Sequence, residues 1–237
     1  MLRFYGLRIL RDYLGHIILI GLPVALITIN TYLSVQNGAV QEEIALFIGL
    51  IYIFMFQVFG AAYTFEGMEH DFYSPFKDRL RAAPVKPFYF ILANLFYSTL
   101  TSLLQSLFIL SYVVIVFGVR VSNWGWMILV FVVAVLLAQL LAGVLIVLLK
   151  KASKAQAVIT LYAILSPMLA GFFFTLPSGR FKPILEQYSS PVAWAWTSVH
   201  AFMDSDFQKA FYFLALLVAL TVVLALVLAQ LSKRVVR

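Results

Sequence analysis

Four polar side chains stand at helical spacing inside the third long apolar segment of the chain, residues 88 to 118. On a helix with 3.6 residues per turn they project within one narrow arc. Amide and hydroxyl groups in hydrocarbon turn toward a partner helix or the bundle interior, where they form hydrogen bonds. The pattern therefore predicts either adhesion between helices or the lining of a substrate path. The four residues are Asn94, Ser98, Thr101 and Gln105.

A cytoplasmic acidic cluster is expected where the preceding apolar segment ends, at Glu66, Glu69 and Asp71. Carboxylates this close together could bind a cation, although acidic residues at the end of a span are ordinarily solvated. The histidines lie far apart and lack the i, i+4 spacing of a helical ligand pair. We therefore expect no metal site. The histidines are His16, His70 and His200.

Nothing in the chain predicts enzymatic chemistry. Ser198, His200 and Asp204 match a nucleophile set by residue type only. No G-x-x-x-x-G-K-[ST] phosphate loop is present, so ATP-driven transport would need an ATPase on another polypeptide. The absence of cysteine excludes disulfides, thiolate ligands and a Cys nucleophile. We expect no catalytic residue and no cofactor in this chain.

Hydropathy predicts the elements that position these residues. The chain is 63% hydrophobic with a mean hydropathy of +0.99, which indicates that the bilayer is its solvent. Crossing a hydrocarbon core of about 30 Å takes about 20 helical residues, and each helix pairs its own backbone polar groups. We predict one all-α transmembrane domain, residues 1–237, with six transmembrane helices. They are 13 to 34, 44 to 65, 88 to 118, 126 to 149, 157 to 176 and 209 to 231.

The distribution of basic residues predicts the orientation of these helices. Lys and Arg in short loops stay on the cytoplasmic side, and 13 of the 17 basic residues fall at the two termini and in the second and fourth connections. The N- and C-termini are therefore expected to be cytoplasmic. This asymmetry and the anionic inner leaflet explain the formal charge of +7, so the charge is no indication of nucleic acid.

Two flanking segments are predicted to lie at the membrane surface. Residues 1–12 read as an N-terminal interfacial helix with apolar and basic faces, or as a span whose end snorkels its arginines. The external segment 177–208 contains two short helical patterns, around residues 181–188 and 190–203. Helices of this length suit re-entrant or interfacial positions, with Trp194 and Trp196 at the headgroup boundary. A plain amphipathic surface loop is the alternative.

The connection of residues 67–87 is the longest polar stretch between two spans. Ser74 can cap a helix, Pro75 suits its first position, and Pro84 blocks its continuation. Phe76 and Leu80 then share one face of a short helix. Because so short a helix is unstable alone in water, it needs either the bilayer or another protein to lie against.

Two blocks of sequence resemble the ABC type-2 permeases, the membrane subunits of many bacterial exporters. The first joins Phe65-Glu66-Gly67-Met68-Glu69 to Leu80-Arg81-Ala82-Ala83-Pro84-Val85 around this connection. The second contains Ser166-Pro167, Gly171, Phe172-Phe173-Phe174, Pro177 and Pro191. With the number of spans, the resemblance covers nearly the whole chain.

The resemblance implies a half-transporter in the bacterial cytoplasmic membrane, paired with a second permease copy, identical or homologous. Two cytoplasmic ATPase subunits would bind ATP and Mg. They would dock on a coupling helix at Phe76, Lys77, Asp78, Arg79, Leu80 and Arg81. An external gate would contain Phe172, Phe173, Trp194 and Trp196.

The expected function is export of a hydrophobic or amphipathic substrate, such as a drug, a lipid, a lipid-linked glycan or a peptide. Spans that lack central charged residues suit such cargo better than ions. Two alternatives stay open. One is an ATP-independent secondary carrier, and the other is a non-transporting assembly or immunity protein that binds a hydrophobic peptide in the membrane.

Overall fold

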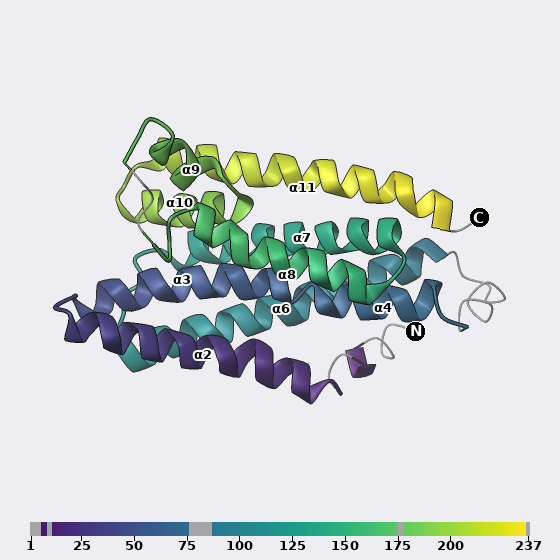
Figure 1. Ribbon diagram of the computed structural model, residues 1–237, viewed down its shortest axis with the longest axis horizontal. Coiled ribbons are helices and arrows are strands. Elements are labelled where there is room, and N and C mark those ends of the chain that lie inside the picture. Colours follow the sequence, from purple (N-terminus) through teal and green to yellow (C-terminus); the bar gives the residue numbers. More distant parts are fainter. Residues whose placement is uncertain (1–5, 9–10, 76–86, 175–177, 236–237) are drawn as a thin grey trace.

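The computed structural model describes residues 6–8, 11–75, 87–174 and 178–235, and within these ranges it is helical, with no strand. The long helices run side by side along the longest axis of the molecule, and two short ones gather at one end (Figure 1). The helices are α2 (Tyr13–Gln36), α3 (Gln41–Phe59), α4 (Ala62–Phe72), α6 (Pro87–Phe117), α7 (Trp124–Leu149), α8 (Ala152–Leu169), α9 (Lys182–Tyr188), α10 (Pro191–Met203) and α11 (Phe207–Val235).

Five segments of the described chain are long and apolar enough to cross a membrane. They coincide with five of the six predicted spans. The remaining predicted span, residues 157–176 and the fifth along the chain, corresponds to α8. This helix has 18 residues and is not among the five segments. Its first turns carry Ser153, Lys154 and Gln156, which lower its hydropathy, and Gly171 at φ 75° follows its end. The five are Tyr13–Gln36, Gln41–Phe72, Tyr89–Phe117, Trp124–Leu149 and Phe207–Lys233.

The second predicted span is longer than its hydropathy indicates. The helix breaks at Gly60–Ala61 and resumes as α4, which continues to Phe72 instead of ending at residue 65. A Cβ on Gly60 would lie 2.6 Å from the hydroxyl oxygen of Ser102 on α6, so glycine permits this close approach. Burial of one face of α4, which includes Met68, stabilises the extension despite its charged residues.

Helix α3 lies at the centre of the bundle, and α2 and α11 lie on opposite flanks (Figure 1). The most apolar window of the Gln41–Phe72 segment is 78% buried, against 22% for α2 and 17% for α11. Phe54 of α3 and Phe131 of α7 are almost fully buried and meet edge to face, 5.4 Å between ring centroids. The flanking helices therefore present most of their apolar side chains outward.

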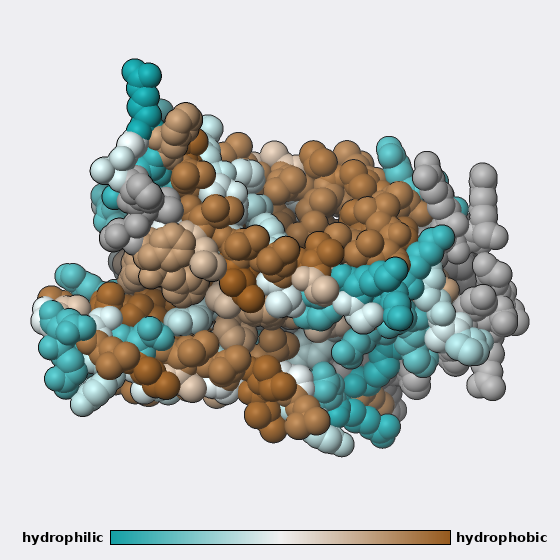
Figure 2. Space-filling view, in the orientation of Figure 1, coloured by the Kyte–Doolittle hydropathy of each residue, from teal (hydrophilic) through white to brown (hydrophobic). Residues whose placement is uncertain are grey.

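Hydrophobic residues cover most of the visible face of α11 and much of α2 and of the half of α8 nearer α10, whereas hydrophilic residues gather toward the two ends of the bundle (Figure 2). Helices α4 and α11 finish, and helix α6 begins, at one end of the bundle, which we call the α4 end. We call the opposite end the α10 end. Exposed apolar side chains such as Ile115 (79%) would be costly in water and are favourable in lipid. The surface is that of a multi-pass membrane protein.

The described residues before α2, residues 6–8 and 11–12, form a separate element that we call the N-terminal arm. Residues 6–8 are helical, and the side chain of Asp12 caps α2 by accepting a hydrogen bond from the Gly15 amide at 3.1 Å. Residues 1–5 and 9–10 lie outside the described chain, and so does most of the predicted interfacial helix.

Candidate functional site

A cluster of polar side chains joins α2, α4 and α6 close to the break between α3 and α4. The Gln105 amide nitrogen lies 3.0 Å from both the Tyr63 hydroxyl and His16 Nδ1, and these two atoms are 2.9 Å apart. The Gln105 amide donates to the Tyr63 hydroxyl, and both groups lie within hydrogen-bond distance of His16 Nδ1. This cluster holds three helices together at one level of the bundle.

A second, fully buried cluster joins α4, α6 and α7. Thr64 donates to the amide oxygen of Gln139 at 2.6 Å, and the Gln139 amide nitrogen donates to Ser102 at 3.0 Å. One helical turn away, Gln57 donates to Ser106 at 3.1 Å. Sequence reasoning missed all of these residues. Some of them had a visible signal, since Ser102 and Ser106 extend the Asn94 and Ser98 row in steps of four and Gln139 is a lone amide in an apolar segment.

The four predicted polar residues of α6 fall in different surroundings. Asn94, Ser98 and Gln105 are buried and Thr101 is half-buried. Ser98 donates to Asn94 Oδ1 at 3.1 Å, and Asn94 lies directly against Gly67 of α4. A Cβ on Gly67 would lie 2.7 Å from Asn94 Cγ and 2.5 Å from Arg8 Nη2. Glycine at 67 therefore allows α4, α6 and the N-terminal arm to meet.

The predicted acidic cluster is divided between two environments. Asp71 is 2% exposed and lies 3.3 Å from the Arg8 guanidinium and 3.2 Å from His70 Nδ1, which ties α4 to the arm. Glu66 is exposed and Glu69 is half-buried. Among the described residues, no group of three or more His, Cys, Asp or Glu is arranged to hold a metal ion.

An elongated cavity of about 370 Å³ lies between α2, the α3–α4 break and α8. Its walls are apolar along most of its length, and its end nearest the arm carries two carboxylates, Asp12 and Glu66. No Lys, Arg or His is found among the described residues that line it. They are Asp12, Gly15, Ile18, Leu19, Leu22, Phe56, Phe59, Ala62, Tyr63, Glu66 and Gln156.

The predicted coupling helix lies outside the described residues. The structure places the ends that flank it: α4 finishes at Phe72, followed by Ser74, whose hydroxyl donates to the His70 carbonyl, and α6 begins at Pro87. The last turn of α4 and the first turn of α6 both lie at the α4 end of the molecule (Figure 1). Because α4 and α6 pack on each other through Gly67 and Asn94, this connection is anchored on both sides.

The predicted external aromatic residues lie at the α10 end. The ring of Trp196, on α10, contacts two other aromatic rings. The centroid distance is 5.2 Å to Phe172, which follows α8, and 5.4 Å to Phe47 of α3. Phe173 lies 6.1 Å from Tyr52, and Trp194 packs half-buried against the core. The structure thus brings Phe172 and Trp196 together over Phe47 of α3 and places Phe173 against Tyr52 of the same helix.

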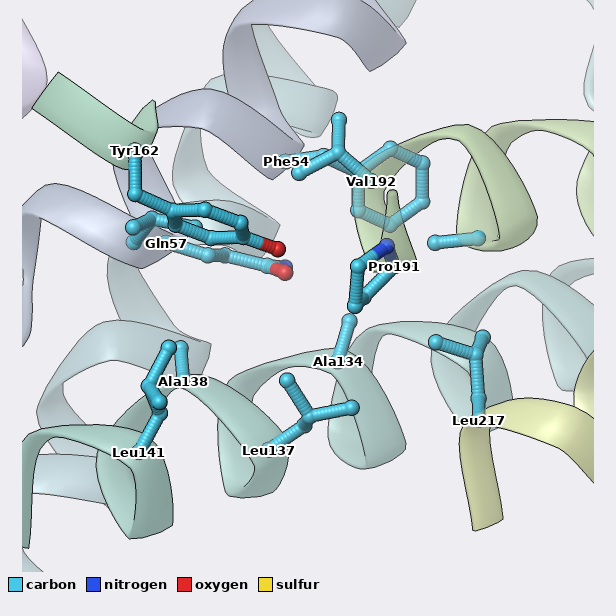
Figure 3. A pocket seen from close by; sticks show the side chains of 12 residues that line it. Phe54, Gln57, Ala134, Leu137, Ala138, Leu141, Tyr162, Pro191, Val192 and Leu217 are labelled. Carbon is cyan, nitrogen blue, oxygen red and sulfur yellow. The ribbon is translucent and has the colours of Figure 1, made fainter. Parts of the chain in front are cut away.

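A small internal cavity of about 20 Å³ lies between α3, α7, α8, α10 and α11 (Figure 3). The polar ends of Gln57 and Tyr162 point into it, toward Pro191 at the start of α10. The other lining residues are apolar, among them Leu137 of α7 and Leu217 of α11. Helix α10 therefore begins deep between the long helices.

The residues that suggested a hydrolase do not form a nucleophile set. His200 pairs with Asp204 at 2.9 Å, but Ser198 is fully buried and donates to the Ala210 carbonyl at 2.9 Å. Its hydroxyl helps to fasten α10 to α11.

A bundle of long apolar helices with buried amide and hydroxyl clusters defines a multi-pass membrane protein. The family model described as ABC-2 family transporter protein matches residues 22–227, and the chain belongs to this family. It is an ABC transporter permease, a class that in general works with a partner ATPase subunit. No curated protein and no solved structure matches the chain.

Proposed function

We propose that this chain is the transmembrane subunit of an ATP-driven exporter that moves a hydrophobic or amphipathic substrate out across the cytoplasmic membrane of a bacterium. The observation that carries the proposal is the anchored connection between α4 and α6. It contains the segment that resembles a coupling helix, and both flanking helices are fixed to the bundle and to the arm through Gly67, Asn94 and Asp71. A force applied to this connection would reach three elements at once.

Six spans with both termini in the cytoplasm are proposed, with α8 as the fifth span. The α4 end carries Lys150, Lys151 and Lys154 where α7 and α8 meet, and Lys233 near the end of α11. This concentration of basic residues supports a cytoplasmic position for the α4 end. Long helices α6, α7 and α11 all finish or start there (Figure 1).

Helices α9 and α10 are proposed to form a re-entrant pair that enters from the outside. The start of α10 lies beside Phe54 and Leu137, whereas farther along it the Ser198 carbonyl accepts a hydrogen bond from the Trp126 indole near the start of α7. Helix α10 therefore runs outward from the interior. Phe172 and Phe173, which precede this pair in the chain, and Trp194 and Trp196 of α10 are the proposed external gate.

In the proposed mechanism two ATPase subunits bind ATP and Mg and dock on the coupling helices of two permease copies. Closure of the ATPase pair pushes the Phe76–Arg81 segment, and α4 transmits the movement to α6 and α7. The hydrogen bonds of Thr64, Gln139 and Ser102 make these helices move together. The gate at the α10 end then opens outward.

The proposed topology predicts which positions react from outside the cell. Because the chain contains no cysteine, single-cysteine variants report one position each. Asn37→Cys and Ser178→Cys are expected to react with a membrane-impermeant maleimide in intact cells. Lys151→Cys and Lys233→Cys are expected to react only after permeabilisation. All four positions are exposed.

The pair Lys151 and Ser178 tests whether α8 crosses the membrane, since they flank it. Labelling of both from the same side would contradict α8 as the fifth span. Labelling of Lys233→Cys in intact cells would contradict the cytoplasmic C-terminus.

Uptake into inside-out vesicles tests the function. Vesicles that contain the chain and its ATPase should accumulate a lipophilic substrate with ATP and not with a non-hydrolysable analogue. Equal accumulation without ATP would identify a secondary carrier. No ATP-dependent uptake of any substrate would support a non-transporting membrane protein.

A further inference from the structure

The cavity between α2, α4 and α8 has the shape of a site for one long, amphipathic molecule. Its volume of about 370 Å³ lies within the range of small-molecule sites. From Asp12 to Leu22 it follows α2 over ten residues, about 15 Å at 1.5 Å per residue. Leu19, Phe56 and Tyr63 are nearly fully buried and form its inner wall.

One side of the cavity faces the surroundings of the bundle. Ile18 and Leu22 line it and are 56% and 47% exposed, although both belong to the apolar helix α2. In a membrane, exposed side chains at this position contact lipid. A molecule dissolved in the bilayer could therefore reach the cavity sideways, without passing through water.

The charges of the cavity select the sign of its occupant. Asp12 and Glu66 lie at one end, and no basic residue is found among the described lining residues. Within the described chain Glu66 forms no hydrogen bond or ion pair, and Asp12 uses only its Oδ1 oxygen to cap α2. The neighbouring Arg8 is paired with Asp71 and also attracts Glu66, so one arginine faces the three carboxylates Asp12, Glu66 and Asp71. Two carboxylates above an apolar wall complement a positively charged head on an apolar body.

We propose that this cavity binds an amphipathic cation, a lipophilic molecule with a protonated amine, taken from the cytoplasmic leaflet as cargo. The amine lies between Asp12 and Glu66, and the apolar body lies along Ile18, Leu22 and Phe56. That the bound cation is transported rests on the proposed exporter function, whereas binding itself requires only the permease.

Binding to the full chain in phosphatidylcholine nanodiscs tests the proposal, because this lipid carries no net charge. The probes are dodecylamine, dodecanol and dodecanoic acid, each with the same fluorophore at its far end. The amine is expected to bind about tenfold more tightly than the alcohol, a difference of about 1.4 kcal/mol, and the acid more weakly than both. Equal affinities for the three probes would overturn the proposal.

Two variants remove the charges and keep the shape. Asp12→Asn retains a capping side chain, and Glu66→Gln is nearly isosteric. Together they are expected to lower amine affinity about tenfold and to leave alcohol affinity unchanged, whereas the control Glu43→Gln, an exposed residue at the other end of α3, changes neither. An unchanged amine affinity in the double variant would overturn the proposal.

Further arms separate the competing explanations. Ala62→Phe, which fills the cavity, should weaken both amine and alcohol and so show that the apolar body lies there. Loss of amine binding when phosphatidylethanolamine replaces phosphatidylcholine would assign the cavity to a lipid amine and overturn the cargo assignment. If binding follows expectation but no ATP-driven uptake occurs in any vesicle, the proposed function fails and the cation site stands.

Discussion

The double variant Phe76→Asp and Leu80→Asp is expected to lose its ATPase. On the predicted short helix these two side chains form the apolar face. Burial of each against the partner would contribute roughly 1.5–3 kcal/mol to the free energy of association. Two charged carboxylates in their place should reduce the amount of ATPase that co-purifies with the permease at least tenfold, on the order of 1.4 kcal/mol or more. Mild-detergent isolation followed by quantification of the ATPase measures this.

Phe181→Asp is the matched control for that experiment. Phe181 is a large apolar residue, 73% exposed, beside α9 at the α10 end. It should leave ATPase association unchanged. If the double variant retains its ATPase, the short helix lies on the bilayer instead, and the coupling assignment is wrong.

Gly67→Val is expected to lower the stability of the protein, because Gly67 is the one glycine of α4 and lies against two other elements. The new side chain would occupy the space of the Asn94 amide and the Arg8 guanidinium, and Asn94 is 1% exposed with little room to move. Overpacking of this kind costs about 1–3 kcal/mol. Thermal unfolding of the purified protein should therefore occur several degrees lower.

Gly21→Val on α2 is the control, because nothing lies within 4 Å of a Cβ at that position. It should unfold close to the wild-type temperature. The combination of Gly67→Ala with Asn94→Ala should recover part of the stability that Gly67→Ala alone loses. Equal unfolding temperatures for Gly67→Val and Gly21→Val would contradict the packing described for α4.

The short helices of the external segment were predictable because local signals define them. Ser190 caps α10 by accepting from the Ala193 amide, and Pro191 occupies the first turn, as its sequence position indicates. The depth of α10 in the bundle was not predictable, since it depends on contacts with Phe54 and Leu137, which are distant in sequence.

The extension of α4 to Phe72 could not be found from hydropathy. Glu66, Glu69 and Asp71 lower the average there, while the residues that stabilise the helix act through partners on other elements, such as Arg8 on the arm and Asn94 on α6. Helix α8 shows the same effect at its start, because its polar first turns belong to the helix although they reduce its apolar length.

The buried polar clusters were predictable only in part. The row on α6 is visible as spacing, and Gln139 stands out as a lone amide in a strongly apolar segment. Which amide meets which hydroxyl depends on how α4, α6 and α7 pack. The cavity between α2, α4 and α8 likewise exists only because three separate elements meet beside the Gly60–Ala61 break.

ATP-driven transport by purified components tests the central claim most directly. The permease would be reconstituted into liposomes with and without its ATPase, and movement of the fluorescent amine, alcohol and acid would be followed. We predict movement only when both the ATPase and hydrolysable ATP are present. Movement by the permease alone without ATP, or no movement of any probe by the complete complex, would contradict the account.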